Sequence, residues 1–151
     1  MPSPFADDLR LARLREADAA LTAPGAPFEL VEEEVLGERM LVLRNRPRSL
    51  RDVLLAGAAR HGDRDVYVWS DGRRSTFTGL VTEVAEVARG LAERYGIGPG
   101  DRVAVCGANC PEYLHTFWAC AALDAVLVAM NGWWTGGEMR NALELLSLIH
   151  I

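Results

Sequence analysis

The sequence contains no lysine, since all 16 of its basic residues are arginines. Arginine stays protonated at any physiological pH, whereas a lysine amine loses its proton readily enough to act as a nucleophile. Any mechanism that uses a lysine as a Schiff base, a phosphate anchor or an adenylation catalyst therefore cannot be completed by this chain.

The sequence also has few cysteines and histidines, three of each. Its three cysteines, Cys106, Cys110 and Cys120, lack the tight paired spacing and the clustered histidines that zinc requires. Thiols in such apolar surroundings are typical of buried, reduced cysteines. We therefore predict a cytoplasmic protein and no metal ligands in this chain.

The sequence has no pattern for crossing or reaching a membrane. Its most apolar stretch, Phe117 to Met130, is interrupted by Asp124 and is shorter than the roughly 20 residues of a membrane-spanning helix. Acidic Asp7 and Asp8 do not fit a signal peptide. The net charge of -5 gives no positive field for a polyanion. We expect no transmembrane segment, no secretion and no nucleic-acid partner.

What is present is an alternation of helical and strand-like patterns. The 151 residues, half of them hydrophobic, suffice for one compact domain. Periodicity and capping residues predict helices, with Ser49 and Thr78 as N-caps and Gly96 as a left-handed helix end. His61 is then a residue at the end of a helix and not a ligand. The predicted helices span 7–21, 50–61, 79–95, 111–123 and 138 onward, and the predicted strands span 28–31, 40–43, 65–69, 73–77, 102–106 and 125–129.

The order of these elements predicts an α/β fold. The first strands form hairpins, with Asp71-Gly72 supplying the positive-φ positions of a tight turn. Strand 102–106, a helix opening at Pro111 and strand 125–129 form a right-handed crossover unit of a parallel sheet whose strands are buried on both faces. The helix from Glu138 breaks off after one or two turns, so the sheet is predicted to be incomplete.

Several segments in series resemble the opening of the AMP-forming acyl-CoA synthetases and related adenylate-forming ligases. They run from Thr76 to Leu80, from Leu91 to Gly96, from Gly98 to Val105, from Asn109 to Glu112, from Phe117 to Leu123, from Val128 to Asn131 and from Trp133 to Gly136, followed by Glu138. Residues 21–28 and the Asn-Gly-Trp-Trp run at 131–134 are similar to bacterial members labelled fatty-acid or long-chain acyl-CoA ligases. The sequence departs from the family where Asp124 replaces a common glycine, and where Ala129 and Met130 replace proline and leucine.

The resemblance covers residues 21 to 145 and implies the N-terminal part of the large domain of such an enzyme. That part is an incomplete parallel sheet with crossover helices, together with an N-terminal hairpin region. We expect a helix and linker at 1–27, a partial synthetase/ligase domain at 28–145 and a non-native tail at 146–151. The tail holds two of only three isoleucines and matches a translated sequencing adapter, so His150 is not treated as functional.

The resemblance also implies ATP, Mg²⁺ and CoA for the parent enzyme, which would activate a carboxylate as an acyl-adenylate before the CoA thiol displaces AMP. A complete member carries a phosphate-binding loop rich in glycine, serine and threonine, an acidic residue for the ribose, a magnesium-binding glutamate and a distal lysine. We find none of these motifs here. We therefore expect no catalytic, cofactor-binding or metal-binding residue in this chain, and no activity of the fragment alone.

Two features imitate functional motifs but favour structural roles. The run Gly96–Gly100 precedes a strand instead of opening a helix, which indicates a turn and not a phosphate loop. Glu112 and His115 have the spacing of half a carboxylate–histidine metal pair, but the sequence contains no second such pair, so an ordinary surface or core histidine is favoured.

Aromatic and amide residues near the strand ends leave two interpretations open. Trp133 and Trp134 line a substrate channel or, as we favour, anchor the packing of a loop. Asn109 and Asn131 follow strands at the end where α/β sheets place ligands, but asparagine also suits turns, which we favour.

Two other hypotheses compete with a ligase fragment. One is a short noncatalytic binding or interaction module of the same fold. The other is a different nucleotide-binding α/β enzyme, which would need a G-x-G-x-x-G run between a strand and a helix that the sequence lacks.

Overall fold

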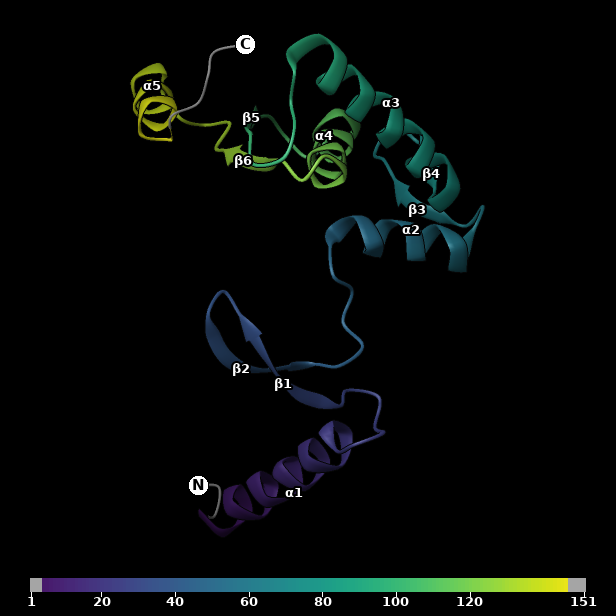
Figure 1. The fold of residues 1–151 in the computed structure, drawn as a ribbon, viewed down its shortest axis with the longest axis vertical. Helices are drawn as coiled ribbons and strands as arrows, with labels where there is room; N and C mark the ends of the chain where they lie inside the picture. Colours follow the sequence, from purple (N-terminus) through teal and green to yellow (C-terminus); the bar gives the residue numbers. More distant parts are fainter. Residues whose placement is uncertain (1–3, 147–151) are drawn as a thin grey trace. The chain divides into compact units, whose positions relative to one another are not determined.

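The computed structural model describes residues 4–146, in which it places five helices and six strands, with side chains described from Arg10 on. The chain divides into two compact units, Met1–Pro47 and Arg48–Ile151 (Figure 1). The mixed helix-and-strand fold confirms the predicted α/β class.

The first unit contains one helix and one hairpin. Helix α1 spans Pro4–Thr22, and strands β1 (Leu30–Val35) and β2 (Glu38–Leu43) pair in antiparallel fashion. Leu36 and Gly37 both have positive φ, at 53° and 87°, as the tightest hairpin turns require. The predicted helix and hairpin are therefore confirmed, although the helix is not packed by its apolar face, because Leu11, Leu14 and Leu21 are all exposed.

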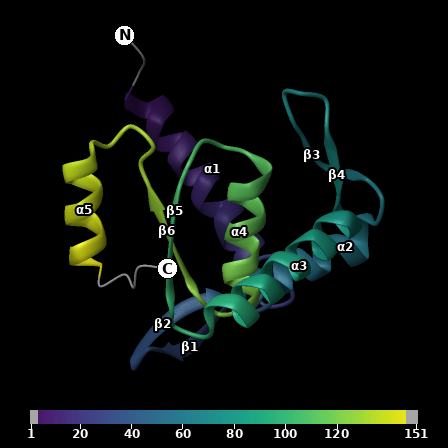
Figure 2. The ribbon, with the colours of Figure 1, turned by 90° about the horizontal axis from the view of Figure 1, so that it is seen from above.

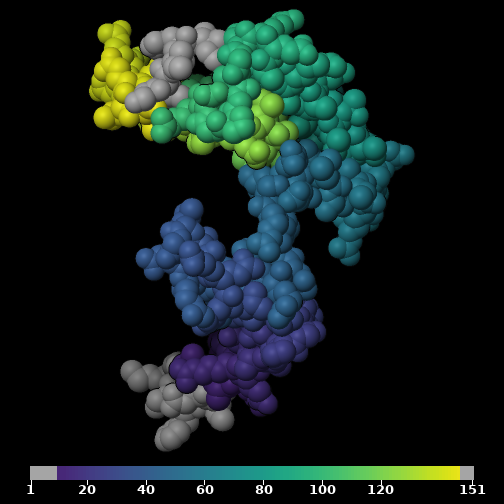
Figure 3. Space-filling view, viewed as in Figure 1, coloured from purple at the N-terminus to yellow at the C-terminus, as the bar shows by residue number. Residues whose placement is uncertain are grey.

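Three helices build the core of the second unit. Helices α2 (Leu50–His61), α3 (Phe77–Tyr95) and α4 (Pro111–Ala122) pack together, and their atoms form one continuous mass in Figure 3. Burial of each large aliphatic side chain contributes roughly 1.5–3 kcal/mol. The buried core consists of Leu54, Leu80, Val84, Ala88 and Ala119.

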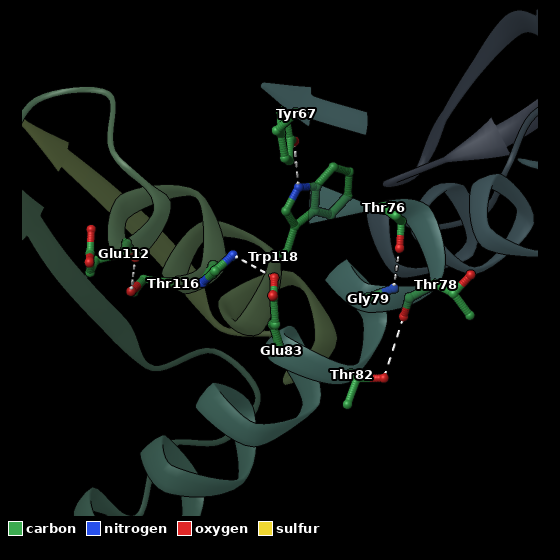
Figure 4. Close-up of polar contacts among 10 residues, drawn as sticks. Tyr67, Thr76, Thr78, Gly79, Thr82, Glu83, Glu112, Thr116 and Trp118 are labelled. Carbon is green, nitrogen blue, oxygen red and sulfur yellow. Dashed lines mark hydrogen bonds and ion pairs between the residues drawn. The ribbon is translucent and has the colours of Figure 1, made fainter. Parts of the chain in front are cut away.

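The helix ends follow the predicted caps with one exception. Ser49 and Asp52 form a capping box at α2, and Gly96 ends α3 in the left-handed conformation, at φ 68°. At the start of α3, however, the cap is Thr76 and not Thr78: the Thr76 hydroxyl accepts the Gly79 N–H at 3.0 Å (Figure 4). Thr78 lies within the first turn of the helix.

The predicted hairpin before α3 is present as β3 (Asp65–Val68) and β4 (Arg74–Thr76). Its turn differs from the prediction, because only Gly72 has positive φ while Asp71 does not. Trp69 and Arg73 close a three-residue loop, and the Gly72 N–H donates to the Trp69 carbonyl at 3.0 Å. A type I turn followed by a left-handed glycine needs only one positive-φ residue.

Strands β5 (Arg102–Cys106) and β6 (Val126–Met130) pair in parallel, joined by α4 with Pro111 in its first turn. Figures 1 and 2 both place this pair of strands between α4 and α5 (Gly136–Leu145). The prediction that both strands are buried on both faces was wrong: Val103 is half-buried and Val126 is 49% exposed. A pair of strands leaves surface that further strands or helices would cover in a larger sheet.

Helix α5 starts earlier and runs further than predicted. Thr135 caps it and Glu138, the predicted start, is its third residue in a capping box. The helix spans ten residues. The predicted tail, 146–151, lies outside the described residues except for Leu146.

Candidate functional site

The two loops that follow β5 and β6 lie side by side. The strands pair in parallel with Cys106 opposite Met130, so both loops leave the sheet at the same edge. A Cβ atom added to Gly132 would lie 4.0 Å from the backbone of Gly107, which places the two loops in close reach of each other. Ligands of open α/β sheets bind at this carboxyl edge.

A hollow of about 350 Å³ opens between these loops. It is lined by Cys106, Gly107, Ala108, Gly132 and Trp133, none of which is an acidic residue, a histidine or an arginine. The thiol of Cys106 lies 3.9 Å from the Asn131 carbonyl oxygen. Small residues and one indole suit contact with an apolar or planar group, whereas phosphate recognition needs cationic or N–H donors.

The outcome for the predicted loop residues is mixed. The Asn131 side chain accepts the Trp133 N–H at 3.0 Å, which confirms its turn role. Trp133 is 93% exposed, so the favoured prediction of a packing anchor was wrong for this residue, and Trp134 is 36% exposed. Asn109 is exposed in the loop after β5. Sequence reasoning missed Cys106, Gly107 and Ala108 as lining residues, although a glycine directly after a buried strand was the available signal.

Carboxylates occupy the N-termini of the helices that follow the loops. The pKa of Glu112 is lowered by its own backbone N–H, then by the Cys110 thiol and by the nearby charges of Arg73 and His115. The pKa of Glu138 is lowered by the backbone N–H and the hydroxyl of Thr135. Because these negative groups take the donors that an anion would use, the α4 and α5 termini do not fit the phosphates of a nucleotide.

The glycine-rich segment before β5 is a turn, as predicted. The Gly98 N–H donates to the Asp101 carboxylate at 2.8 Å, and the Gly100 N–H donates to the Asp124 carbonyl at 2.9 Å. With both donors used within the chain, this segment offers no cradle for phosphate.

The two histidines within residues 4–146 lie on helices and do not line the hollow. His115 of α4 and Glu83 of α3 face each other with Nε2 and Oε2 3.1 Å apart, both atoms shielded from solvent. His61 ends α2, and its ring lies 4.8 Å from that of Phe77. Within residues 4–146, no group of three or more His, Cys, Asp or Glu side chains is arranged to hold a metal ion.

The cysteines differ in their burial. Cys120 is buried, and burial raises the pKa of its thiol. Cys110 is half-buried and Cys106 is exposed, so the prediction of three buried thiols was right only for Cys120. None of the helices described is at once long enough and apolar enough to cross a membrane.

Comparison with known proteins gives one consistent result. A family model described as AMP-binding enzyme matches residues 54–147. The acyl-CoA ligase sidI of Aspergillus fumigatus is 33% identical over 137 residues, 88% of this chain and 22% of that protein. A feruloyl-CoA synthase of Amycolatopsis is 42% identical over 76 residues, 50% of this chain and 13% of that protein.

A solved structure extends the similarity to the fold. The fatty acyl CoA synthetase of Mycobacterium tuberculosis superposes with a TM-score of 0.60 at 28% identity, over 63% of this chain and 19% of that one. This chain thus spans about a fifth of the length of the acyl-CoA ligase sidI.

Proposed function

Because this chain belongs to the family of AMP-binding enzymes, we propose that it is part of an ATP-dependent ligase that joins a carboxylic acid to coenzyme A. In the proposed reaction the carboxylate attacks the α-phosphorus of ATP and releases pyrophosphate, and the CoA thiol then displaces AMP from the acyl-adenylate. The observation that carries this proposal is the 137-residue similarity to an acyl-CoA ligase.

We infer that the acid is a fatty acid. Similarity in sequence and fold to a fatty acyl CoA synthetase supports this choice, and so does the hollow beside Trp133, which no acidic residue, histidine or arginine lines. The feruloyl-CoA synthase relative makes an aromatic acid the alternative outcome. A full-length enzyme assayed with both acid classes decides between them: a higher kcat/KM for long-chain acids supports the proposal, and a higher kcat/KM for phenylpropenoic acids contradicts it.

We further propose that the 151 residues contribute scaffold and are inactive alone. The chain has no lysine, and glutamates occupy the N-termini of both helices that follow the parallel strands. ATP and Mg²⁺ do not fit the described residues, so we assign their binding to other parts of the parent enzyme. We propose that the parent enzyme is cytoplasmic. Its other parts would then supply the groups that neutralise charge at phosphorus and at the carbonyl oxygen, which this chain lacks.

Two measurements test these proposals. The contiguous gene is recovered and translated beyond Leu145: continuation into a loop rich in serine, threonine and glycine and a distal lysine supports the ligase, whereas an immediate stop favours a noncatalytic binding module. Acid-dependent exchange of labelled pyrophosphate into ATP is then compared between the 151-residue chain and the full-length enzyme. Exchange by the short chain alone would contradict the scaffold proposal.

A further inference from the structure

The C-terminal half of α3 carries an exposed charged face that the proposed ligase function does not use. A hollow of about 420 Å³ lies along this face, lined among others by Glu86, Arg89, Gly90, Glu93 and Arg94. All four charged side chains are exposed. None of the four forms an ion pair within the part of the chain that the structure describes. Charges three or four residues apart on a helix can pair with one another. Because these four do not, their side chains remain available to a partner.

In an antiparallel pair of α3 helices, acidic residues of this face on one copy lie opposite basic residues on the other. Glu86 stands four residues before Gly90 and Arg94 stands four residues after it. In an antiparallel pair of α3 helices related by a two-fold axis at Gly90, Glu86 of each copy therefore lies opposite Arg94 of the other. Arg89 and Glu93 are brought near each other across the same axis. In such an interface, residue i meets residue j and j meets i.

Gly90 permits the two helices to approach closely. A Cβ atom added there would meet no other atom within 4 Å, so the chain's own atoms leave the space over Gly90 open to a second helix. Gly90 costs helix stability relative to alanine, and a helix tolerates this where close packing uses the space. Tyr95, 52% exposed at the rim, adds apolar contact area beside the ion pairs.

We propose that this face, formed by Glu86, Arg89, Gly90, Glu93, Arg94 and Tyr95, is a self-association surface that docks a second copy of this chain. The copies pack antiparallel along α3 with the two-fold axis at Gly90 and four ion pairs across it. The dimer is weak and salt-sensitive, because exposed ion pairs contribute little each and are screened by ions.

Sedimentation equilibrium of the 151-residue chain at low and high salt tests the proposal. We expect a concentration-dependent dimer at low salt, weakened at high salt. Glu86→Arg or Arg94→Glu alone places like charges opposite each other and weakens the dimer about tenfold or more. Mixing the two variants restores both Glu–Arg pairs, so the mixture associates like the original chain. Arg140→Glu, an exposed reversal on α5, leaves association unchanged.

Three results would overturn the proposal. One is a monomer at all concentrations in low salt. Another is association that survives Glu86→Arg and Arg94→Glu, which would place the contact elsewhere, for example on the exposed leucines of α1. The last is a mixture that associates no better than either variant alone. Circular dichroism of each variant confirms that the helices are retained.

Discussion

Asp124 has a backbone conformation that glycine adopts more easily. Its φ is 56°, and the loop depends on it, because its carbonyl accepts the Gly100 N–H. For an L-residue the left-handed region costs about 1–2 kcal/mol, less for aspartate than for most residues. We predict that Asp124→Gly raises the free energy of unfolding by about 0.5 kcal/mol and that Asp124→Ala lowers it by about 1 kcal/mol, measured by urea unfolding.

A glycine substitution in another loop of the same unit serves as the control for Asp124. Ser70 lies in the loop of the β3–β4 hairpin and does not have positive φ. Glycine at this position gains no conformational relief and adds entropy to the unfolded chain, so Ser70→Gly does not raise stability. An equal gain from both substitutions would mean that backbone conformation is not the cause at Asp124.

The stability of the start of α5 depends on pH through the carboxylate of Glu138. Its pKa lies below the ordinary value of 4.5, chiefly because the Thr135 N–H donates to the carboxylate at 2.7 Å and the Thr135 hydroxyl donates at 2.8 Å. A depressed folded-state pKa means that the carboxylate stabilises the fold above about pH 4.5 and that this contribution is lost as the pH falls through the lower folded value.

We therefore expect the Glu138 carboxyl carbon to titrate by NMR at a pH below 4.5, the ordinary pKa of a glutamate. In Thr135→Ala the hydroxyl is lost, so the titration moves toward 4.5. A midpoint that is the same with and without the hydroxyl would show that the cap does not control the charge.

At the scale of elements, two threonines compete to cap α3. Thr76 accepts the Gly79 N–H (Figure 4), whereas the exposed Thr78 hydroxyl donates to the Asp63 carboxylate at 3.1 Å. Removing an N-cap hydroxyl costs about 1 kcal/mol, whereas an exposed substitution elsewhere in a helix costs less than about 0.5 kcal/mol. We predict that Thr76→Ala lowers the urea midpoint and Thr78→Ala barely does. The reverse order would assign the cap to Thr78.

The same helix shows what the sequence predicts and what it does not. Periodic Leu80 and Val84 and the terminal Gly96 were enough to predict α3, because burial and left-handed geometry restrict those positions to few residue types. The start was misplaced because tertiary contacts decide it: the Phe77 N–H donates to the Arg64 carbonyl and the Thr78 N–H to the Gly62 carbonyl. Acceptors contributed by a preceding loop let a helix begin earlier than its best local cap.

The candidate site was less predictable than the helices. Short apolar runs on either side of a helix predicted β5 and β6 and their parallel pairing, but strand burial depends on neighbours that a local pattern does not specify. Trp133 was expected to pack and is exposed for the same reason. The hollow arises because two glycine-containing loops, 25 residues apart at Gly107 and Gly132, leave one sheet edge together, and this juxtaposition follows from strand pairing and not from any local motif.

At the scale of the whole molecule, the second unit contains a core of its own. Every residue of the buried cluster, from Leu54 to Ala119, lies within Arg48–Ile151. The Trp118 indole donates to the Tyr67 hydroxyl at 3.0 Å and ties α4 to the hairpin within the same unit (Figure 4). All four tryptophans also lie there, so their fluorescence reports on this unit.

We predict that deleting residues 1–47 leaves the tryptophan emission and the urea midpoint of the second unit unchanged. The core substitution Leu80→Ala gives the matched test, since Leu80 is only 1% exposed and its loss leaves a cavity costing about 2–5 kcal/mol. Because every residue of the buried cluster around Leu80 lies in the second unit, Leu80→Ala costs the same in the full chain and in residues 48–151. A deletion that abolishes cooperative unfolding, or a Leu80→Ala cost that differs between the two lengths, would mean that the first unit contributes to the stability of the second. Equal costs would mean that the helical core is stabilised by its own packing, and that any parent enzyme has this unit as one of its independently stable parts.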